Sequence, residues 1–349
     1  MPLINKLSAR LQNHPKRVVF PEGADMRIIQ AARQFATRKL GVPILIGDRT
    51  RIKAIAARLD VKLDGIRIIE PARSAELPSF VELLRGMQRF NGMNDAEASD
   101  YVLSPNYFAC MMLLTGAADA MVCGATTVPT NALRAIFQLI PRQPGVETIS
   151  SMQLLVKEDS NLGINGTLFL ADCAVIPEPT AEQLADIAIT TSMLCHHLTN
   201  EPPRVALLSY TSKSLTRKTP TVEKVKAATA IARAKARDFD VPVEIDGELQ
   251  VDAALDAFTA NVKGIESPVA GKANVLVFPD LNSGNIASKF AQLVAEIPAY
   301  GQILTGLAKP IAEISRGASA HDILGSAIIV AAQAVDRHYL YPVVPEGEA

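Results

Sequence analysis

The stretch Asn274-Val275-Leu276-Val277-Phe278-Pro279-Asp280-Leu281-Asn282-Ser283-Gly284-Asn285-Ile286 indicates the fold class of this chain. It joins a short apolar run, typical of a buried parallel strand, to a turn rich in Asn and Gly and then to a helix. Further strands of this kind are predicted at 17–20, 43–47, 120–124 and 204–210, and helices at 25–39, 181–197 and 222–237. Thr180 and Gln183 predict a capping box at the start of the second of these helices. This alternation predicts α/β layers around mainly parallel sheets.

In such folds ligands bind near the carboxyl ends of the strands. The loops that follow predicted strands begin at Gly124, Ser209, Asp280 and Ser315. We therefore expect the ligand-binding residues on these loops.

The last of these loops carries reactive side chains. Ser315-Arg316-Gly317 is followed by Asp322, which opens an apolar helical run. A guanidinium can hold a phosphate by two parallel hydrogen bonds, a carboxylate can accept a proton, and a hydroxyl can donate to a developing oxyanion. Two plainer interpretations stay open: Ser319 and Asp322 fit a capping box, and Ser315 and Arg316 fit a solvated turn.

Composition excludes several classes of function. With 349 residues the chain is long enough for two domains, and its net charge of −1 favours neither nucleic acid nor an anionic membrane as a partner. No apolar run reaches membrane-spanning length, and no secretory segment is recognisable at the start. The four cysteines lack metal-ligand spacing, and the five histidines do not cluster. We therefore expect reduced core cysteines, a cytoplasmic location and no metal site.

Five motifs in order closely resemble the phosphate acetyltransferase (phosphotransacetylase) family, from about residue 17 to about 335. They are the segments 19–23 (Val-Phe-Pro-Glu-Gly), 171–188, 246–254, 277–286 and 315–317. The resemblance implies reversible acetyl transfer, in which acetyl-CoA and phosphate give CoA and acetyl phosphate. It implies no bound cofactor, because CoA or acetyl-CoA is a substrate.

The resemblance also assigns site residues. Asp322 is implied to deprotonate the CoA thiol, Arg316 to bind the phosphoryl end, and Ser315 to polarise the reacting group. Arg85 and Arg134 are implied to bind phosphate groups of the substrate or CoA, although Arg85 also fits the solvated face of an amphipathic helix. Further substrate or CoA-phosphate contacts are assigned to Thr130, Ser209, Lys213, Asn282 and Asn285.

Architecture follows from the resemblance as well. It implies two α/β domains with an active-site cleft between them, similar to the isocitrate and isopropylmalate dehydrogenases. The first domain would comprise 1–148 and 303–349, and the second 149–302. A homodimer is also implied.

The chemistry is consistent with this reaction. A thiol with a pKa near about 8.5 is mostly protonated at neutral pH, so a neighbouring base is useful because the thiolate is the nucleophile. No Gly-x-Ser-x-Gly elbow is present. Direct transfer in a ternary complex is therefore favoured over an acyl-enzyme.

Two loops depart from the family pattern. Where the family commonly has two threonines, this chain has Val128-Pro129, and hydroxyls of Thr126, Thr127 or Thr130 can replace them. The loop 211–220 lacks glycine, and its Lys213, Arg217 and Lys218 either grip CoA phosphates or form an ordinary basic surface loop.

There are three alternatives to acetyl transfer, the first two because of these loops and the third because dehydrogenases share the implied two-domain shape. In the first, propionyl or butyryl groups are the substrates. In the second, the chain senses acetyl-CoA without turnover, like the phosphotransacetylase-like module of bifunctional malic enzymes. The third alternative, a metal-dependent decarboxylating dehydrogenase, needs acidic metal ligands and an adenine-nucleotide loop, and neither is recognisable here. The retained Ser315, Arg316 and Asp322 favour catalysis.

Overall fold

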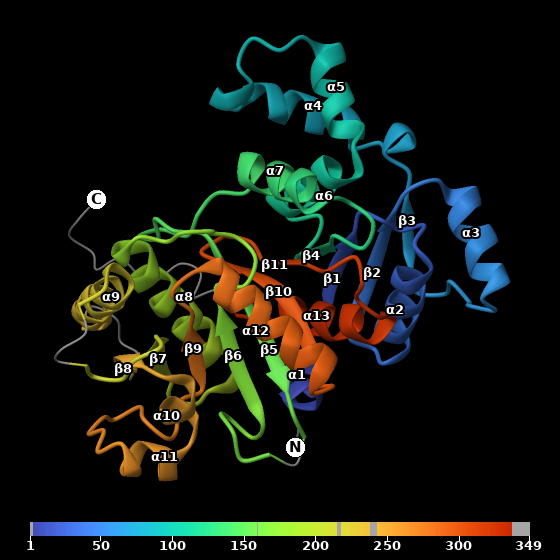
Figure 1. Ribbon diagram of the computed structural model, residues 1–349. Helices are drawn as coiled ribbons and strands as arrows, with labels where there is room; N and C mark the ends of the chain where they lie inside the picture. The colour runs from blue at the N-terminus through green and yellow to red at the C-terminus, as the bar shows by residue number, and fades with distance from the viewer. Residues whose placement is uncertain (1–2, 159, 215–217, 238–242, 337–349) are drawn as a thin grey trace. The chain divides into compact units, whose positions relative to one another are not determined.

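The computed structural model describes residues 3–158, 160–214, 218–237 and 243–336, which contain two compact units (Figure 1). Of the described residues, 6–141 and 307–336 form the N-terminal unit, and 3–5 together with those of 142–306 form the middle unit. The domain bounds at 148/149 and 302/303 and the cleft between the domains stay predictions. The predicted α/β class is confirmed, because strands alternate with helices in both units.

The N-terminal unit contains a parallel set of strands in the order β3-β2-β1-β4-β11. The strands are β1 (Lys16–Phe20), β2 (Gly41–Ile46), β3 (Arg67–Ile69), β4 (Ala120–Cys123) and β11 (Ile311–Glu313). The chain runs outward from β1 to β3 and then returns to the other side of β1 as β4. Val19, which pairs with both Ile44 and Met121, is fully buried. A central strand buried on both faces explains the continuous apolar pattern of the sequence.

Apart from α1, the helices of this unit begin at side-chain caps or at prolines. Asp25 caps α2 by accepting from Arg27 and Ile28, Asp48 caps α3, and Asn94 forms a capping box with Glu97 at α5. Helices α2 and α13 pack against each other, as do α6 and α7 (Figure 1). The bounds are α1 (Leu3–Asn13), α2 (Met26–Thr37), α3 (Arg49–Arg58), α4 (Leu77–Gly86), α5 (Asp95–Leu103), α6 (Pro105–Leu114), α7 (Pro129–Leu139) and α13 (Ala320–Gln333), with short 3-10 turns at Pro71–Arg73 and Gln88–Phe90.

The middle unit has its strands in the order β10-β5-β6-β9-β7-β8. The four strands from β6 to β8 are parallel, whereas β5 pairs antiparallel with both β6 and β10. All seven residues of β5 are buried, so its sequence does not reveal this direction. The bounds are β5 (Ser150–Val156), β6 (Thr167–Ala171), β7 (Arg204–Leu208), β8 (Glu244–Leu249), β9 (Val275–Val277) and β10 (Ala299–Thr305).

The two long helices predicted in the middle unit are confirmed as α8 (Ala181–Thr199) and α9 (Pro220–Ala236). The predicted capping box of Thr180 and Gln183 begins α8. The remaining helices are α10 (Val251–Leu255), α11 (Ala257–Val262) and α12 (Leu281–Val294).

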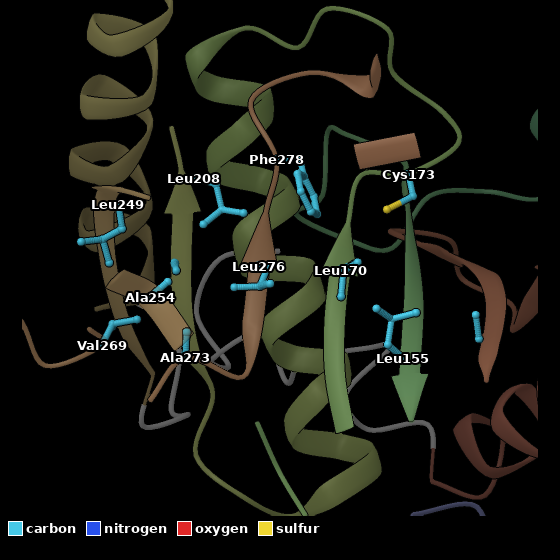
Figure 2. Close-up of a cluster of buried hydrophobic side chains, with 12 residues drawn as sticks. Leu155, Leu170, Cys173, Leu208, Leu249, Ala254, Val269, Ala273, Leu276 and Phe278 are labelled. Carbon is cyan, nitrogen blue, oxygen red and sulfur yellow. The ribbon is translucent and has the colours of Figure 1, made fainter. Parts of the chain in front are cut away.

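A buried cluster of side chains in the middle unit joins its strands to the loops around them. Figure 2 shows Leu170, Leu276 and Leu208 on the neighbouring strands β6, β9 and β7, with Phe278 and Cys173 at the ends of β9 and β6. Replacing such a leucine by alanine costs roughly 2–5 kcal/mol. This packing fixes the strand ends from which the loops at Asp172, Ser209 and Asp280 depart.

Candidate functional site

The predicted Ser315 and Arg316 lie in an exposed turn directly after β11. The Ser315 hydroxyl oxygen accepts from the Gly317 amide at 3.3 Å, and the Ser315 carbonyl accepts from the Ala318 amide at 2.9 Å. The turn is therefore held by its own backbone, and both side chains are open to solvent.

Asp322 is half-buried in the first turn of α13, where the predicted capping box is confirmed. The Ser319 amide and hydroxyl both donate to Asp322 Oδ2, at 2.9 and 2.8 Å, and the Asp322 amide donates to Ser319 Oγ at 3.2 Å. Within the described part of the chain no hydrogen bond reaches Oδ1 of Asp322. One oxygen thus orients the carboxylate and the other is left able to accept a proton.

Arg27, in the first turn of α2, ties two loops together and was not predicted from the sequence. Its Nη1 donates to the carbonyls of Arg316 (2.6 Å) and Ala318 (2.9 Å), and its Nη2 donates to Ala125 O (2.8 Å). Asp25 holds the guanidinium through Nε at 3.1 Å and Nη2 at 2.9 Å. The turn of Arg316 is therefore braced by a fixed side chain, while the Arg316 guanidinium itself is unengaged among the described residues.

The ion pair also shifts the ionisation of Asp25. Burial by itself raises the pKa of Asp25, but the hydrogen bonds and the charge of Arg27 outweigh it and place that pKa below its ordinary value. The hydrogen bonds that Arg27 donates to Asp25 in turn raise the pKa of Arg27. Both groups stay charged at neutral pH, so the contacts of Arg27 with the turn of Arg316 persist there.

The carboxylate of Glu22, a residue that follows β1, binds the backbone of the loop after β4. Its carboxylate accepts from four successive backbone amides, those of Gly124 (3.0 Å), Ala125 (2.9 Å), Thr126 (3.0 Å) and Thr127 (2.8 Å). Successive amides of this kind form an anion-binding concavity. Here the chain supplies the anion itself, so these amides are occupied.

Gly124 permits the close approach of this loop to the end of β11. Its φ is +105°, a value that side chains rarely allow, and a Cβ atom there would lie 2.4 Å from the carbonyl oxygen of Ile314. The loop after β4 can therefore lie directly against the strand that leads into Ser315.

Of the other predicted residues in this unit, Arg134 and Thr130 lie on α7 and are exposed. Arg134 lines a cavity of about 1000 Å³ together with Thr126 and Thr127. Arg85, in the last turn of α4, instead donates from Nε to Met93 O at 3.0 Å and pairs through Nη1 with Asp95. Its assignment to phosphate binding stays a prediction, and it would require this pair to open.

The middle unit carries the remaining predicted residues. The hydroxyl of Ser209, just after β7, is buried and has no hydrogen-bond partner among the described residues. Asn282 is exposed on α12, and Asn285 Nδ2 donates to the carbonyl of Cys173 at 3.0 Å. Asp280 caps that helix by accepting from the Ser283 amide at 2.8 Å.

Lys213 is engaged inside the middle unit. Its Nζ pairs with Asp246 and donates to Gly247 O at 2.9 Å. Burial by itself raises the pKa of Asp246, but the hydrogen bonds from Lys213 and other donors lower it below its ordinary value. A CoA contact by Lys213 stays a prediction and competes with this pair. Lys218 is exposed, and Arg217 lies outside the described residues.

The expectation of buried, reduced cysteines is confirmed for Cys110, Cys123, Cys173 and Cys195. Burial raises the pKa of each thiol, so none is a reactive thiolate. Among the residues described, no three His, Cys, Asp or Glu side chains group as a metal site. In the same residues no helix has both the length and the apolar character to cross a membrane.

Over most of its length this chain is similar to known proteins. The sequence profile of the Phosphate acetyl/butaryl transferase family matches residues 2–331. The phosphate acetyltransferase of Acetivibrio thermocellus is 40% identical over 334 residues, which cover 96% of this chain and 98% of that protein.

Solved structures of related proteins have a similar fold. A phosphotransacetylase from Streptococcus pyogenes superposes with a TM-score of 0.85 at 36% identity, covering 95% of this chain and 98% of the other. A 4-hydroxythreonine-4-phosphate dehydrogenase from Klebsiella pneumoniae shares the fold, with a TM-score of 0.53 at 14% identity over 91% of this chain and 98% of that one. The predicted dehydrogenase-like architecture is thus confirmed, and the chain belongs to the phosphate acetyl/butaryl transferase family of acyltransferases.

Proposed function

We propose that this chain transfers an acetyl group reversibly between CoA and phosphate, by direct thiolate attack and without a bound cofactor. The proposal is carried by two side chains close together in the sequence: Arg316, whose guanidinium is unengaged among the described residues, and Asp322, whose carboxylate is oriented through one oxygen only. Similarity to phosphate acetyltransferases supports the choice of acetyl and of CoA, acetyl-CoA, acetyl phosphate and phosphate as substrates.

In the proposed reaction Asp322 Oδ1 accepts the proton of the CoA thiol. The thiolate then attacks the carbonyl carbon of acetyl phosphate, a carbon–sulfur bond forms, and the carbon–oxygen bond to phosphate breaks. The capping box keeps Oδ2 in place while Oδ1 gains and loses the proton. Asp322 therefore ends protonated, and it returns the proton to solvent or to the released phosphate.

Arg316 and Ser315 act on the other reactant. The guanidinium of Arg316 holds the phosphoryl group by two parallel hydrogen bonds and neutralises the leaving phosphate. The Ser315 oxygen accepts from the Gly317 amide, so its own hydrogen can be donated to the carbonyl oxygen that becomes negative. Because Arg27 grips the carbonyls on either side of Gly317, this turn is rigid before substrate arrives.

Other predicted contacts are assigned to the phosphates of CoA or of the acyl phosphate. They are Arg85, Arg134, Thr130, Ser209, Lys213, Asn282 and Asn285. Arg134 and Ser209 are the best supported, since among the described residues the Arg134 guanidinium forms no hydrogen bond or ion pair and the Ser209 hydroxyl has no partner. Longer acyl groups, or acetyl-CoA sensing without turnover, are the alternatives that the altered loops at 126–130 and 211–220 leave.

We also propose a cytoplasmic homodimer. Helix α12 exposes Ile286 (65%), Phe290 (63%), Leu293 (77%) and Val294 (64%), which the helical period places on one side. A monomer seldom leaves such a stripe in water, and a two-fold axis lets it pack against its own copy.

The function is tested by following thioester formation from CoA and acetyl, propionyl or butyryl phosphate. We expect turnover with acetyl phosphate that falls by about 10³-fold or more in Arg316→Ala, as for loss of an electrostatic stabiliser. Arg49→Ala, which removes an exposed guanidinium of α3, is the matched control and should leave the rate unchanged. Turnover only with the longer acyl phosphates would reassign the substrate. Acetyl-CoA binding without turnover on any of them would leave a sensor.

A further inference from the structure

The cavity of the N-terminal unit has a size that suits a nucleotide. Its volume is about 1000 Å³, and its floor is built by the turns after β1 (21–26) and β2 (46–48) and by Thr126 and Thr127 after β4. Small-molecule sites commonly have volumes of about 300–1000 Å³. Neither Ser315, Arg316 nor Asp322 lines it.

The strand order of the N-terminal unit explains why a ligand would bind at this position. In the N-terminal unit the order β3-β2-β1-β4 reverses direction at β1, because the chain leaves β1 toward β2 and later returns on its other side as β4. Open parallel sheets bind ligands outside the carboxyl ends of the strands at such a switch point, and nucleotides are frequent among those ligands. The cavity lies over these strand ends.

Unpaired positive charge lines the cavity. Arg51 and Arg58 reach it from α3 and Arg134 from α7, and in the described residues none of the three guanidinium groups forms a hydrogen bond or an ion pair. The three acidic residues of the lining are already engaged: Asp25 is paired with Arg27, Glu22 accepts four amides, and Asp48 caps α3 by accepting from the Arg51 amide at 2.6 Å. A ligand with phosphate groups would balance the three arginines.

The remaining walls suit a flat, partly polar ring. Tyr101 and Tyr107 meet edge to face with centroids 5.1 Å apart, and the Tyr107 hydroxyl is held by Gln138. Beside them Asn106 is only 8% exposed, and its Oδ1 has no hydrogen-bond partner among the described residues. A buried amide without a partner is costly unless a ligand supplies one.

We propose that this cavity binds an adenosine phosphate. Its phosphates lie on Arg51, Arg58 and Arg134, and its base lies against the tyrosines. Asp48, at the carboxyl end of β2, occupies the position from which an acidic residue contacts the ribose in dinucleotide folds. The turn 21–25 lacks the glycine-rich fingerprint and Asp25 caps α2, so the arginines hold the phosphates in place of that helix end.

Two sources share this chemistry: the nucleotide half of CoA, and a free adenine nucleotide. The first source rests on the proposed function, whereas binding of the second is independent of turnover. Calorimetric titration with ADP, adenosine 3′,5′-bisphosphate, CoA and pantetheine separates them, because pantetheine lacks the nucleotide.

The test uses Arg58→Ala and Arg51→Ala, with Lys53→Ala as control, since Lys53 is an exposed cation of α3 outside the cavity. We expect one ADP or adenosine 3′,5′-bisphosphate per chain, bound at least tenfold more weakly by each arginine variant and equally well by Lys53→Ala. Asn106→Leu should weaken ADP and leave inorganic pyrophosphate unchanged. Thermal melting of each variant checks that it is folded.

Kinetics then identify the source. A higher KM for CoA in Arg58→Ala, with an unchanged KM for acetyl phosphate, assigns the cavity to CoA. Lost ADP binding with unchanged KM for CoA assigns it to a free nucleotide. The proposal is overturned if no adenosine phosphate binds saturably, or if binding is equally tight in both arginine variants.

Discussion

Arg27 Nη1 lies 2.6 Å from the carbonyl oxygen of Arg316, although 289 residues separate the two along the chain. The contact joins the start of α2 to the turn that presents the proposed phosphate-binding guanidinium. Its strength comes from a charged donor that is itself fixed by Asp25.

Replacing Arg27 by lysine should therefore lower kcat while the protein stays folded. A lysine keeps the charge, but it cannot donate to three carbonyls in a fixed planar geometry. A small displacement of Arg316 is expected to cost about 10²-fold in rate. Arg33→Lys, on the same helix but bonded only to Asp64 O at 2.9 Å among the described residues, is the control. A normal kcat in Arg27→Lys would show that the brace is not needed for catalysis.

Asp322→Asn should reduce turnover by about 10³-fold with little change in CoA affinity, because an amide cannot take the thiol proton. Ser319→Ala separates the two roles of this carboxylate. It removes the cap and should cost about 1 kcal/mol of stability with a smaller effect on rate. Steady-state kinetics and thermal melting measure both. If Asp322→Asn turned over normally, Asp322 would keep only its capping role.

Glu22→Ala should destabilise the N-terminal unit by about 2–3 kcal/mol, because four loop amides lose a charged acceptor. The expected measurement is a lower denaturant midpoint than that of the wild type. The carboxylate of Glu76 accepts one hydrogen bond, from the Ser74 hydroxyl at 3.1 Å, and pairs weakly with Arg67 at 3.7 Å, so Glu76→Ala should lower the midpoint much less. Equal midpoints for the two variants would contradict this assignment.

The low pKa of Asp246 predicts how the stability of the protein falls in acid. In the folded state this pKa lies below the ordinary carboxyl value, so the stability that Asp246 contributes is fully present above the unfolded pKa of about 3.9. That contribution is lost as the pH falls from about 5 through the ordinary value toward the lower folded pKa. The wild type should therefore lose more stability than Asp246→Asn between pH 5 and 3. Parallel pH curves for the two proteins would refute it.

The proposed dimer can be tested on α12. Phe290→Glu places a charge in the exposed apolar stripe and should shift the mass measured by light scattering from dimer to monomer. Gln292→Glu adds the same charge on another side of the helix and should stay dimeric. A wild type that is monomeric at micromolar concentration, or a dimer that survives Phe290→Glu, would remove α12 from the interface.

Local features of this chain could be predicted from its sequence. The capping boxes at Thr180 and Ser319 depend on residues three positions apart, and both are confirmed. The α/β alternation could be read because central parallel strands are apolar throughout. For the same reason the antiparallel direction of β5 could not be predicted. A strand that is buried on both faces has the same apolar sequence pattern in either direction.

Contacts between residues far apart in the sequence could not be predicted. Arg27 looks like an ordinary residue in the first turn of a helix, and only the fold brings it to the carbonyl of Arg316. Lys213 looks like a surface cation, yet it pairs with Asp246. The motif around Glu22 marked the turn as important but could not indicate that its carboxylate fills the loop after β4.

The carboxylate of Glu22 works as a built-in counter-ion. Because the four amides it satisfies belong to the same molecule, the shape of that loop should be indifferent to the ionic strength and to the phosphate content of the medium. The guanidinium groups of Arg316 and Arg134 have no such internal partner among the described residues. In concentrated salt, then, the scaffold of the site should persist while its hold on anionic substrates fades.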